Sequence, residues 1–381
     1  MSFWSLTIIL AIICGQLIRI PIGDGGITIL DSTIIILCFL GLLKIKFLLK
    51  KPPQFIFASF FFISISILSL ALSPLHLSFG EYFISFSYIT RFSLYILFAW
   101  LIFSDAFPKI KSEISNLLIY SAIAIASIGL MQLVFLPDLN FLTKFGWDPH
   151  FFRTVSTFLD PNFTGAYLVL TLLLLYCHSR GSGNPYKYLF FVLTYLALLT
   201  TFSRSSYLMF LVSGLSLSFL EKSKMLFIKI IVLFLILLLG FQLYTQIISK
   251  PRNIDRVQSA SLRINTWQQG WQLFNYHPFL GIGFNAYRFG IREYQLGDDQ
   301  FLQSHGASSN DSSLLFVLST TGVIGLISYL YFLFSIAKYS TNKKTVLSSI
   351  TGLLIHSIFA NSLFFPSILL WLLLISINSK K

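Results

Sequence analysis

The sequence is organised as a series of apolar runs, each about 17–25 residues long, which is the length of a helix that crosses the ~30 Å hydrocarbon core of a bilayer. Barrel strands would need only about 9–11 residues each. The composition agrees, because 55% of the residues are hydrophobic and 11% are charged, against about 25% in a soluble protein. These features exclude a soluble enzyme, a secreted disulfide-rich module and a nucleic-acid-binding domain. The sequence therefore predicts an all-α polytopic membrane protein.

The runs predict about twelve transmembrane helices and one large hydrophilic loop. The loop, residues 245–312, separates nine helices in 1–244 from three helices in 313–381, and we expect it to contain short helices on the membrane surface. A shorter polar stretch, 137–162, lies between the fifth and sixth helices. The predicted spans are 3–22, 27–44, 54–73, 83–103, 116–136, 163–178, 187–202, 206–220, 225–244, 313–337, 346–360 and 363–378.

The lysines predict how the chain is oriented. If the N-terminus is cytoplasmic and the number of helices is even, 15 of the 17 lysines lie on the cytoplasmic side. Loops rich in lysine and arginine stay in the cytoplasm as a rule. We therefore expect both termini to be cytoplasmic and the loop 245–312 to lie outside the membrane.

The arginines follow the opposite distribution, because nine of the ten lie outside or within the membrane. A guanidinium group stays charged and pairs with phosphate through two parallel hydrogen bonds. This distribution favours an anionic, lipid-linked ligand, with a diphosphate as the natural candidate. Binding to lipid headgroups or pairing with loop acids remains the alternative for the arginines of the large loop: Arg252, Arg256, Arg288 and Arg292, near Asp255, Glu293, Asp298 and Asp299.

Three stretches hold the residues that could carry chemistry. The first is Ser203-Arg204-Ser205, in the short connection between the seventh and eighth predicted helices. This position places Arg204 at the outer rim of the bilayer, where a charge is costly unless it is paired or reaches the interface. The alternative is an interfacial arginine that only ends a helix.

The second stretch lies in the large loop. Residues 264, 267, 271 and 274 are apolar or aromatic, and this helical spacing predicts that Arg263 opens a helix on the membrane surface. The start of such a helix would favour a bound phosphate. The segment His277-Pro278-Phe279-Leu280-Gly281-Ile282-Gly283 predicts a turn that ends this helix and approaches another part of the chain. Alternatively, Trp267 and Trp271 serve only as an interfacial anchor.

The third stretch precedes the tenth predicted helix. Asp311 lies at the start of this helix, so it is either a base that faces an outer cavity or a helix-capping residue. His305 is a second candidate for the base. Gly322 and Gly325 have the spacing of close helix packing.

Several further residues give weaker signals. Arg153 and the sequence Asp160-Pro161-Asn162 precede the sixth helix on the outer side and could join the same site. Asp31 and Arg91 are charges within the membrane, which are as a rule paired or functional. The three cysteines, Cys14, Cys38 and Cys177, imply no disulfide or metal framework.

Together, these motifs resemble the bacterial O-antigen ligase and polymerase family of membrane glycosyltransferases, over roughly residues 150–330. The family has a Ser-Arg turn between two helices, here Ser203-Arg204. Its large loop carries an arginine shortly before a tryptophan and then His-Pro-x-x-Gly-x-Gly, here Arg263, Trp267 and His277 to Gly283. The Pro161-Asn162 pair matches the usual start of a helix in the family. The helix after the loop begins with a histidine in the family, where this sequence has Asp311.

The resemblance implies a GT-C-like enzyme of the bacterial inner membrane, with its active site on the periplasmic face. Its donor would be a glycan linked to undecaprenyl diphosphate, and its acceptor a hydroxyl of a glycolipid. Arg204 and Arg263 would bind the diphosphate, without a metal or another cofactor. Arg153, Asn162, Trp267, His277 and Arg288 would bind substrate, and a chain-length regulator would be a further partner.

The aspartate at position 311 favours the polymerase branch of the family, because this branch more often tolerates a residue other than histidine there. An aspartate is a weaker base than histidine unless burial raises its pKa. Ligation of the glycan to lipid A-core remains the alternative within the family. A lipid-linked oligosaccharide flippase is the alternative from another class, although a transporter is expected to have a polar pathway at the midplane and symmetric halves.

Overall fold

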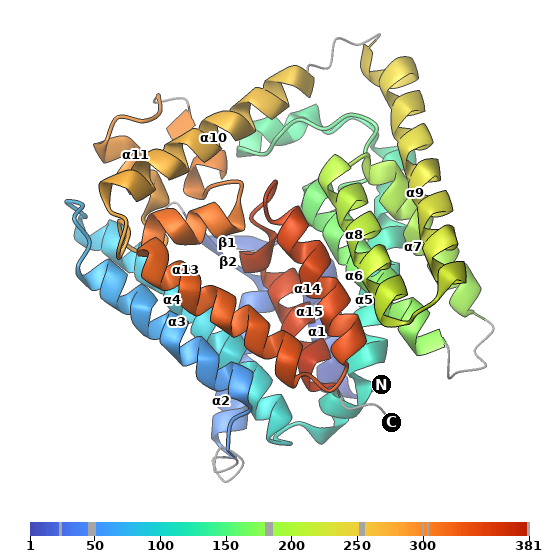
Figure 1. Cartoon of the computed structure of the whole chain (residues 1–381), viewed down its shortest axis with the longest axis horizontal. Coiled ribbons are helices and arrows are strands. Elements are labelled where there is room, and N and C mark those ends of the chain that lie inside the picture. The colour runs from blue at the N-terminus through green and yellow to red at the C-terminus, as the bar shows by residue number, and fades with distance from the viewer. Residues whose placement is uncertain are drawn as a thin grey trace.

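The computed structural model describes residues 1–22, 25–44, 51–179, 186–250, 256–298, 301–302 and 305–378. In this part of the chain each of the twelve predicted spans falls on a helix, and the helices form one bundle (Figure 1). These helices are α1 (Phe3–Cys14), α2 (Ile29–Leu42), α3 (Gln54–Ala71), α4 (Phe79–Phe103), α5 (Pro108–Phe135), α6 (Pro161–Ser179), α7 (Lys187–Thr201), α8 (Arg204–Leu220), α9 (Lys224–Tyr244), α13 (Ser313–Tyr339), α14 (Lys343–His356) and α15 (Pro366–Ile377).

Five helices of the described residues are long and apolar enough to cross a membrane, so the chain is a membrane protein. They are Gln54–Ala71, Phe79–Phe103, Pro108–Phe135, Lys224–Ser249 and Ser313–Tyr339. Shorter apolar helices occupy several of the other predicted spans. In the span Lys224–Ser249, which contains α9, only 17% of the most apolar stretch is buried, so most of this helix presents apolar side chains to its surroundings.

The predicted all-α class is confirmed, since the structure is 77% helical, but the first span is shorter than expected. Helix α1 ends at Cys14, and the predicted span 3–22 finishes in strand β1 (Arg19–Ile22), which pairs antiparallel with β2 (Gly25–Thr28). Gly15 ends the helix with a φ of 53°, a conformation that favours glycine. A Cβ atom at this position would lie 2.4 Å from the carbonyl oxygen of Thr157, so the close approach of the outer loop also requires glycine.

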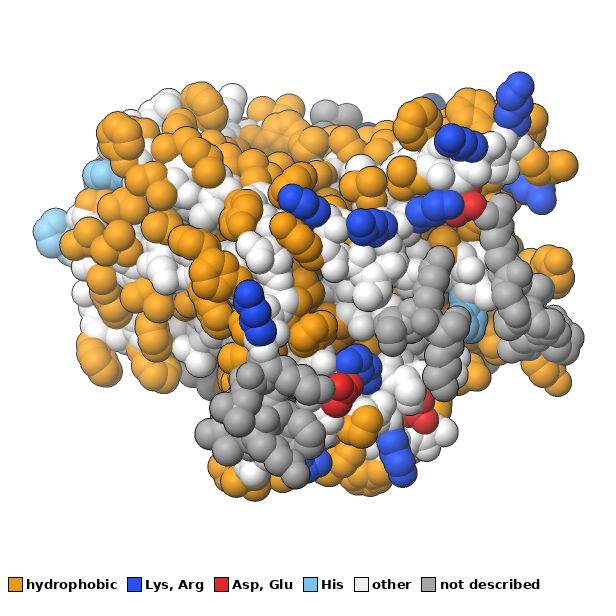
Figure 2. All heavy atoms as spheres, turned by 60° about the horizontal axis from the view of Figure 1, so that its bottom comes forward, with side chains coloured by type: hydrophobic (Ala, Val, Ile, Leu, Met, Phe, Trp, Pro, Cys, Tyr) orange, Lys and Arg blue, Asp and Glu red, His pale blue; other side chains and the backbone are white. Residues whose placement is uncertain are grey.

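The segment 245–312 contains short helices, as predicted, and one long helix that was not expected. Helix α10 (Arg256–Tyr276) is 21 residues long, and it lies across the end of the bundle (Figure 1). It is followed by α11 (Tyr287–Glu293) and by the 3-10 helix His305–Ser308. Both chain termini lie at the opposite end of the bundle (Figure 1). Figure 2 shows basic side chains distributed among hydrophobic ones across that opposite end.

Helix α13 is interrupted by the turn that follows α10. Gly322 has a φ of 66° and breaks the helix. The turn enters this break, where the backbone N–H of Val323 donates to the Pro278 carbonyl at 2.9 Å and that of Gly283 donates to the Thr320 carbonyl at 3.0 Å. A Cβ at position 322 would lie 2.1 Å from the carbonyl oxygen of Phe279. The turn therefore approaches another part of the chain as predicted, but Gly322 accommodates this turn and not a neighbouring helix.

Candidate active site

The ends of three helices meet in a cluster of buried polar side chains. Asn162 lies at the start of α6, Ser203 and Ser205 at the start of α8, and His356 is the last residue of α14. The Oδ1 atom of Asn162 accepts hydrogen bonds from Ser203 Oγ at 2.7 Å and from Ser205 Oγ at 3.1 Å. The Nε2 atom of His356 lies 3.3 Å from Ser205 Oγ. The two serines and His356 are almost fully buried, so these hydrogen bonds fix the Ser-Arg turn against the bundle.

The turn that presents Arg204 is held by its own backbone and by Arg153. Phe202 ends α7 with a φ of 47°, and Ser203 caps α8 by accepting a hydrogen bond from the backbone N–H of Ser206. Arg153 donates from Nε to the Thr201 carbonyl at 2.9 Å and from Nη2 to the Phe202 carbonyl at 3.3 Å. These contacts satisfy carbonyls that the end of α7 leaves without helical partners. Arg204 is thereby placed as the first residue of α8, with its side chain exposed.

Asp311 faces α10 and does not cap a helix. Ser312 is the N-cap of α13, because its hydroxyl accepts from the backbone N–H of Leu315. The Oδ2 atom of Asp311 instead accepts a hydrogen bond from Thr266 Oγ1 at 3.0 Å. Burial raises the pKa of the Asp311 carboxyl above its ordinary value of 3.8, and the nearby charge of Arg263 partly opposes this shift. The alternative that Asp311 is a capping residue is therefore wrong.

The neighbouring residue fastens this segment to α10. The amide nitrogen of Asn310 donates to the carbonyl oxygen of Thr266 and, at 3.0 Å, to the hydroxyl of Tyr287. Asn310 is fully buried. The start of α13 therefore has a fixed position relative to the middle of α10.

Arg263 connects the two halves of the cluster. Its charge acts on Asp311 and also on His356, which in turn contacts the Ser-Arg turn. The prediction that Arg263 opens its helix is wrong, because α10 already begins at Arg256. The partial positive charge of a helix start therefore does not act at Arg263.

The outer loop 137–162 contributes acidic residues to the same region. Burial raises the pKa of Asp160, the charge of Asp148 raises it further, and the charge of Arg153 lowers it. The charge of Asp148 also acts on Asp311. Asp160 Oδ1 accepts a hydrogen bond from the backbone N–H of Asn162 at 2.5 Å, which fixes the start of α6. Among the described residues, no group of three or more histidine, cysteine, aspartate and glutamate side chains could hold a metal ion.

An open, largely apolar groove runs along α10 next to Arg263. It is lined by Ile264, Trp267, Gln268, Trp271, Gln272, Ser312, Leu315 and Ile358. The ring of Trp267 packs at 5.9 Å from the ring of Phe359, in the segment after α14. Its indole N–H is buried and has no hydrogen-bond partner among the described residues. Trp267 therefore joins α10 to the bundle as well as lining the groove.

Other predicted site residues lie elsewhere or have other partners. His277 Nε2 lies 2.6 Å from the hydroxyl of Tyr294, and burial lowers the pKa of this histidine. Arg288 is half-buried in α11. His305 begins a 3-10 helix, and its side chain lies outside the described part of the chain. The contact of His277 with Tyr294 lies away from the cluster formed by the helix ends and holds the turn after α10.

The other charged candidates are partly accounted for by ion pairs. Arg292 pairs at 2.6 Å with Glu81, an acid outside the large loop. Arg91 pairs with Asp31 at 3.0 Å, as the rule for charges within a membrane predicts. Arg252 and the side chain of Arg256 lie outside the described residues.

His356 is the member of the cluster that sequence reasoning missed. It lies near the end of an apolar run and belongs to none of the motifs that mark the other residues. Its only signal is that a titratable side chain occurs at the end of a predicted span. Such a residue contacts the site only if its helix ends next to the Ser-Arg turn. Helix α14 packs against α8, and its last residue, His356, does lie beside this turn.

Comparison with known proteins agrees with the sequence motifs. A family model described as O-antigen ligase matches residues 189–330, a region that contains Arg204, Arg263 and Asp311. A search of curated proteins returned no match.

Proposed function

We propose that the chain is a membrane glycosyltransferase that joins a lipid-linked glycan to an acceptor sugar, because residues 189–330 match a family model described as O-antigen ligase. Members of the family are enzymes that act in O-antigen synthesis. The observation that carries the proposal is the cluster around Arg263, where Asp311 and His356 lie within reach of its charge. This cluster combines a cation with a candidate base at the surface end of an apolar bundle.

The donor in this proposal is a glycan linked through a diphosphate to undecaprenol. Arg204 and Arg263 bind the diphosphate and stabilise the charge that grows as it leaves. Positioned donors of this kind contribute about 3 kcal/mol or more each to transition-state stabilisation in a site shielded from water. Because these two guanidinium groups neutralise the charge of the diphosphate, the proposed reaction needs no metal ion.

Asp311 acts as the general base. The oxygen of an acceptor hydroxyl attacks the anomeric carbon of the donor, and its proton passes to the Asp311 carboxylate. The bond between that carbon and the diphosphate oxygen breaks, and the electron pair leaves with the diphosphate. The raised pKa of Asp311 supports this role, because a buried carboxylate is a stronger base than an exposed one.

The groove along α10 fits the lipid part of the donor. It is open, mostly apolar and bordered by Trp267 and Trp271, two residues that favour a membrane interface. A polyprenyl chain in this groove would bring its diphosphate towards Arg263. In this proposal the reaction takes place on the periplasmic face of the inner membrane, and the distribution of the lysines supports this orientation.

Polymerisation of repeat units is the reaction that we favour within the family. The reason is the aspartate at position 311, where the ligases are expected to use histidine. Ligation to lipid A-core is compatible with the same geometry, because both reactions have the same donor and both deprotonate an acceptor hydroxyl.

A reconstituted assay tests the proposed function. Purified protein in liposomes receives one undecaprenyl-diphosphate-linked repeat unit, and the products are separated on a gel. A ladder of multimers without any other glycolipid supports polymerisation. Product that forms only after lipid A-core is added supports ligation. Movement of the donor across the bilayer without product in either case would contradict the proposal and indicate a flippase.

A further inference from the structure

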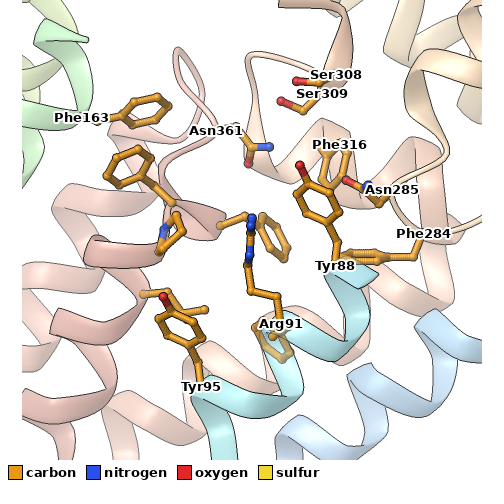
Figure 3. Close-up of a pocket in the computed structure, with 15 residues that line it drawn as sticks. Tyr88, Arg91, Tyr95, Phe163, Phe284, Asn285, Ser308, Ser309, Phe316 and Asn361 are labelled. Carbon is orange, nitrogen blue, oxygen red and sulfur yellow. The ribbon is translucent and has the colours of Figure 1, made fainter. Parts of the chain in front are cut away.

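A second cavity, of 170 Å³, lies beside the candidate active site. It shares two segments with that site, because Phe163 follows Asn162 in α6 and Ser309 lies two residues before Asp311. Figure 3 shows side chains from several segments converging on this space. The lining residues come from α4, from the turn after α10, from the start of α13 and from the segment between α14 and α15.

The cation in this cavity is neutralised and held in place. The guanidinium of Arg91 rises from α4 into the cavity (Figure 3). Its Nη2 atom pairs with Asp31 at 3.0 Å and donates to the Gly26 carbonyl at 2.6 Å. The hydroxyl of Tyr95 donates to the other oxygen of Asp31 at 3.0 Å. Because Asp31 balances the charge, this cavity favours a neutral ligand that accepts hydrogen bonds over a phosphate.

Two amide side chains provide further hydrogen-bonding groups. The Oδ1 atom of Asn361 is buried and has no hydrogen-bond partner among the described residues. A buried acceptor without a partner costs free energy, unless a ligand supplies the donor. Asn285 has a φ of 61°, a conformation that asparagine adopts more readily than most other residues except glycine. Both amides line the same cavity (Figure 3).

Aromatic rings form most of the remaining wall: Tyr88, Phe92, Tyr95, Phe163, Phe284, Phe316, Phe364 and Phe365. A sugar ring has C–H groups that pack on such rings and a rim of hydroxyls that pair with amides, serines and a guanidinium. A cavity of about 150 Å³ holds one benzene molecule. The volume of 170 Å³ therefore suits a single six-membered ring and not a long oligosaccharide.

We propose that this cavity is a sugar-binding subsite, which takes one neutral sugar ring of the glycan beside the reaction centre. The identity of the ligand as a glycan rests on the proposed function. The hydrogen-bonding groups of the subsite are those of Arg91, Asn285 and Asn361. The ring belongs either to the acceptor or to the donor glycan, since both carry the same kind of group.

Binding of free sugar tests the subsite without any transfer reaction. The probe is the repeat-unit oligosaccharide, released from its lipid by mild acid, so that it carries no diphosphate. Saturation-transfer NMR with the full chain in nanodiscs should detect its ring protons. We expect Asn361→Ala and Asn285→Gly each to weaken the affinity by about tenfold, that is about 1.4 kcal/mol. Glycine tolerates the φ of position 285, so the second variant keeps its fold.

Two controls separate this inference from the proposed function. Asn140→Ala removes an exposed amide from the outer loop and should leave the affinity unchanged. Arg263→Ala should abolish transfer and still bind the free sugar. Equal affinity in the wild type and both cavity variants, or no signal from the wild type at millimolar sugar, would overturn the subsite even if transfer is observed.

Kinetics then identify which substrate supplies the ring. With donor and acceptor supplied separately, a rise of about tenfold in the KM of one substrate, with kcat nearly unchanged, assigns the subsite to that substrate. A fall in kcat with both KM values unchanged would contradict a binding role.

Discussion

The carboxylate of Asp311 accepts a hydrogen bond from the hydroxyl of Thr266 at 3.0 Å, which joins the start of α13 to the middle of α10. Arg263 lies one helical turn before Thr266, and its charge acts on the same carboxylate. The residue proposed to take the proton and the residue proposed to hold the diphosphate are thus fixed by one helix.

Removal of the Thr266 hydroxyl should change the pKa of the proposed base and leave the surrounding packing in place. Thr266→Val keeps the side-chain shape but removes a hydrogen bond that favours the ionised carboxylate by about 1.5 kcal/mol or more, so at a pH below the pKa we expect kcat to fall by about tenfold. The hydrogen bond lowers the pKa of Asp311, so its loss should move the acid limb of the activity profile to higher pH. Asn265→Ala, an exposed neighbour on α10, is the control and should leave both quantities unchanged.

The identity of the base predicts a pH dependence. A base acts in its deprotonated form, so activity should rise with pH through the raised pKa of Asp311. Asp311→His should retain activity, and burial together with the charge of Arg263 should keep the limb of this variant below about 6.5, the ordinary pKa of histidine. Asp311→Asn cannot accept a proton and should be nearly inactive. If Asp311→Asn transferred glycan at the wild-type rate, another group would be the base.

The guanidinium of Arg204 should not be replaceable by an ammonium. Arg204→Lys keeps the charge but loses the paired donors that match a phosphate, so we expect a loss of roughly 10²-fold in kcat/KM. The protein should still insert and fold, which gel filtration in detergent can show. Near-normal activity would remove Arg204 from the diphosphate site.

The break in α13 predicts a difference between two glycine substitutions. Gly322→Ala places a Cβ 2.1 Å from the Phe279 carbonyl and strains a φ of 66°, so the protein should lose about 1–3 kcal/mol of stability. A Cβ at Gly80, near the start of α4, meets no atom within 4 Å. Gly80→Ala should therefore leave the thermal unfolding temperature unchanged or slightly higher. Equal temperatures for the two variants would contradict the observed break.

Hydrophobic run length predicted the positions of the helices well, because burial of a backbone in lipid leaves a helix as the main solution. It could not predict that α1 stops at Cys14, since this depends on the contact between Gly15 and the loop around Thr157. Helix α10 begins at Arg256, seven residues before the start that apolar spacing predicts. Apolar spacing marks only the packed face of a helix, and its polar first turns carry no such signal.

The candidate site was predictable where a motif marked it. Arg204, Arg263 and Asp311 were found by their positions in the outer connections and by the family pattern. His356 and Asn361 come from a segment without any motif, and they reach the site only through the packing of α14 and α15. The sequence alone does not distinguish a base from a helix cap at Asp311. In the structure the hydroxyl of Ser312, and not the carboxylate of Asp311, accepts the hydrogen bond from the backbone N–H of Leu315 that caps α13.

Transfer by an Arg263 variant is the measurement that tests the central claim most directly. In liposomes that contain the lipid-linked repeat unit, the account predicts that Arg263→Ala abolishes the ladder of products. Arg292→Ala, which removes an arginine paired with Glu81 outside the cluster, should retain the ladder. A normal ladder from Arg263→Ala would contradict the account, because no diphosphate site centred on Arg263 could then exist.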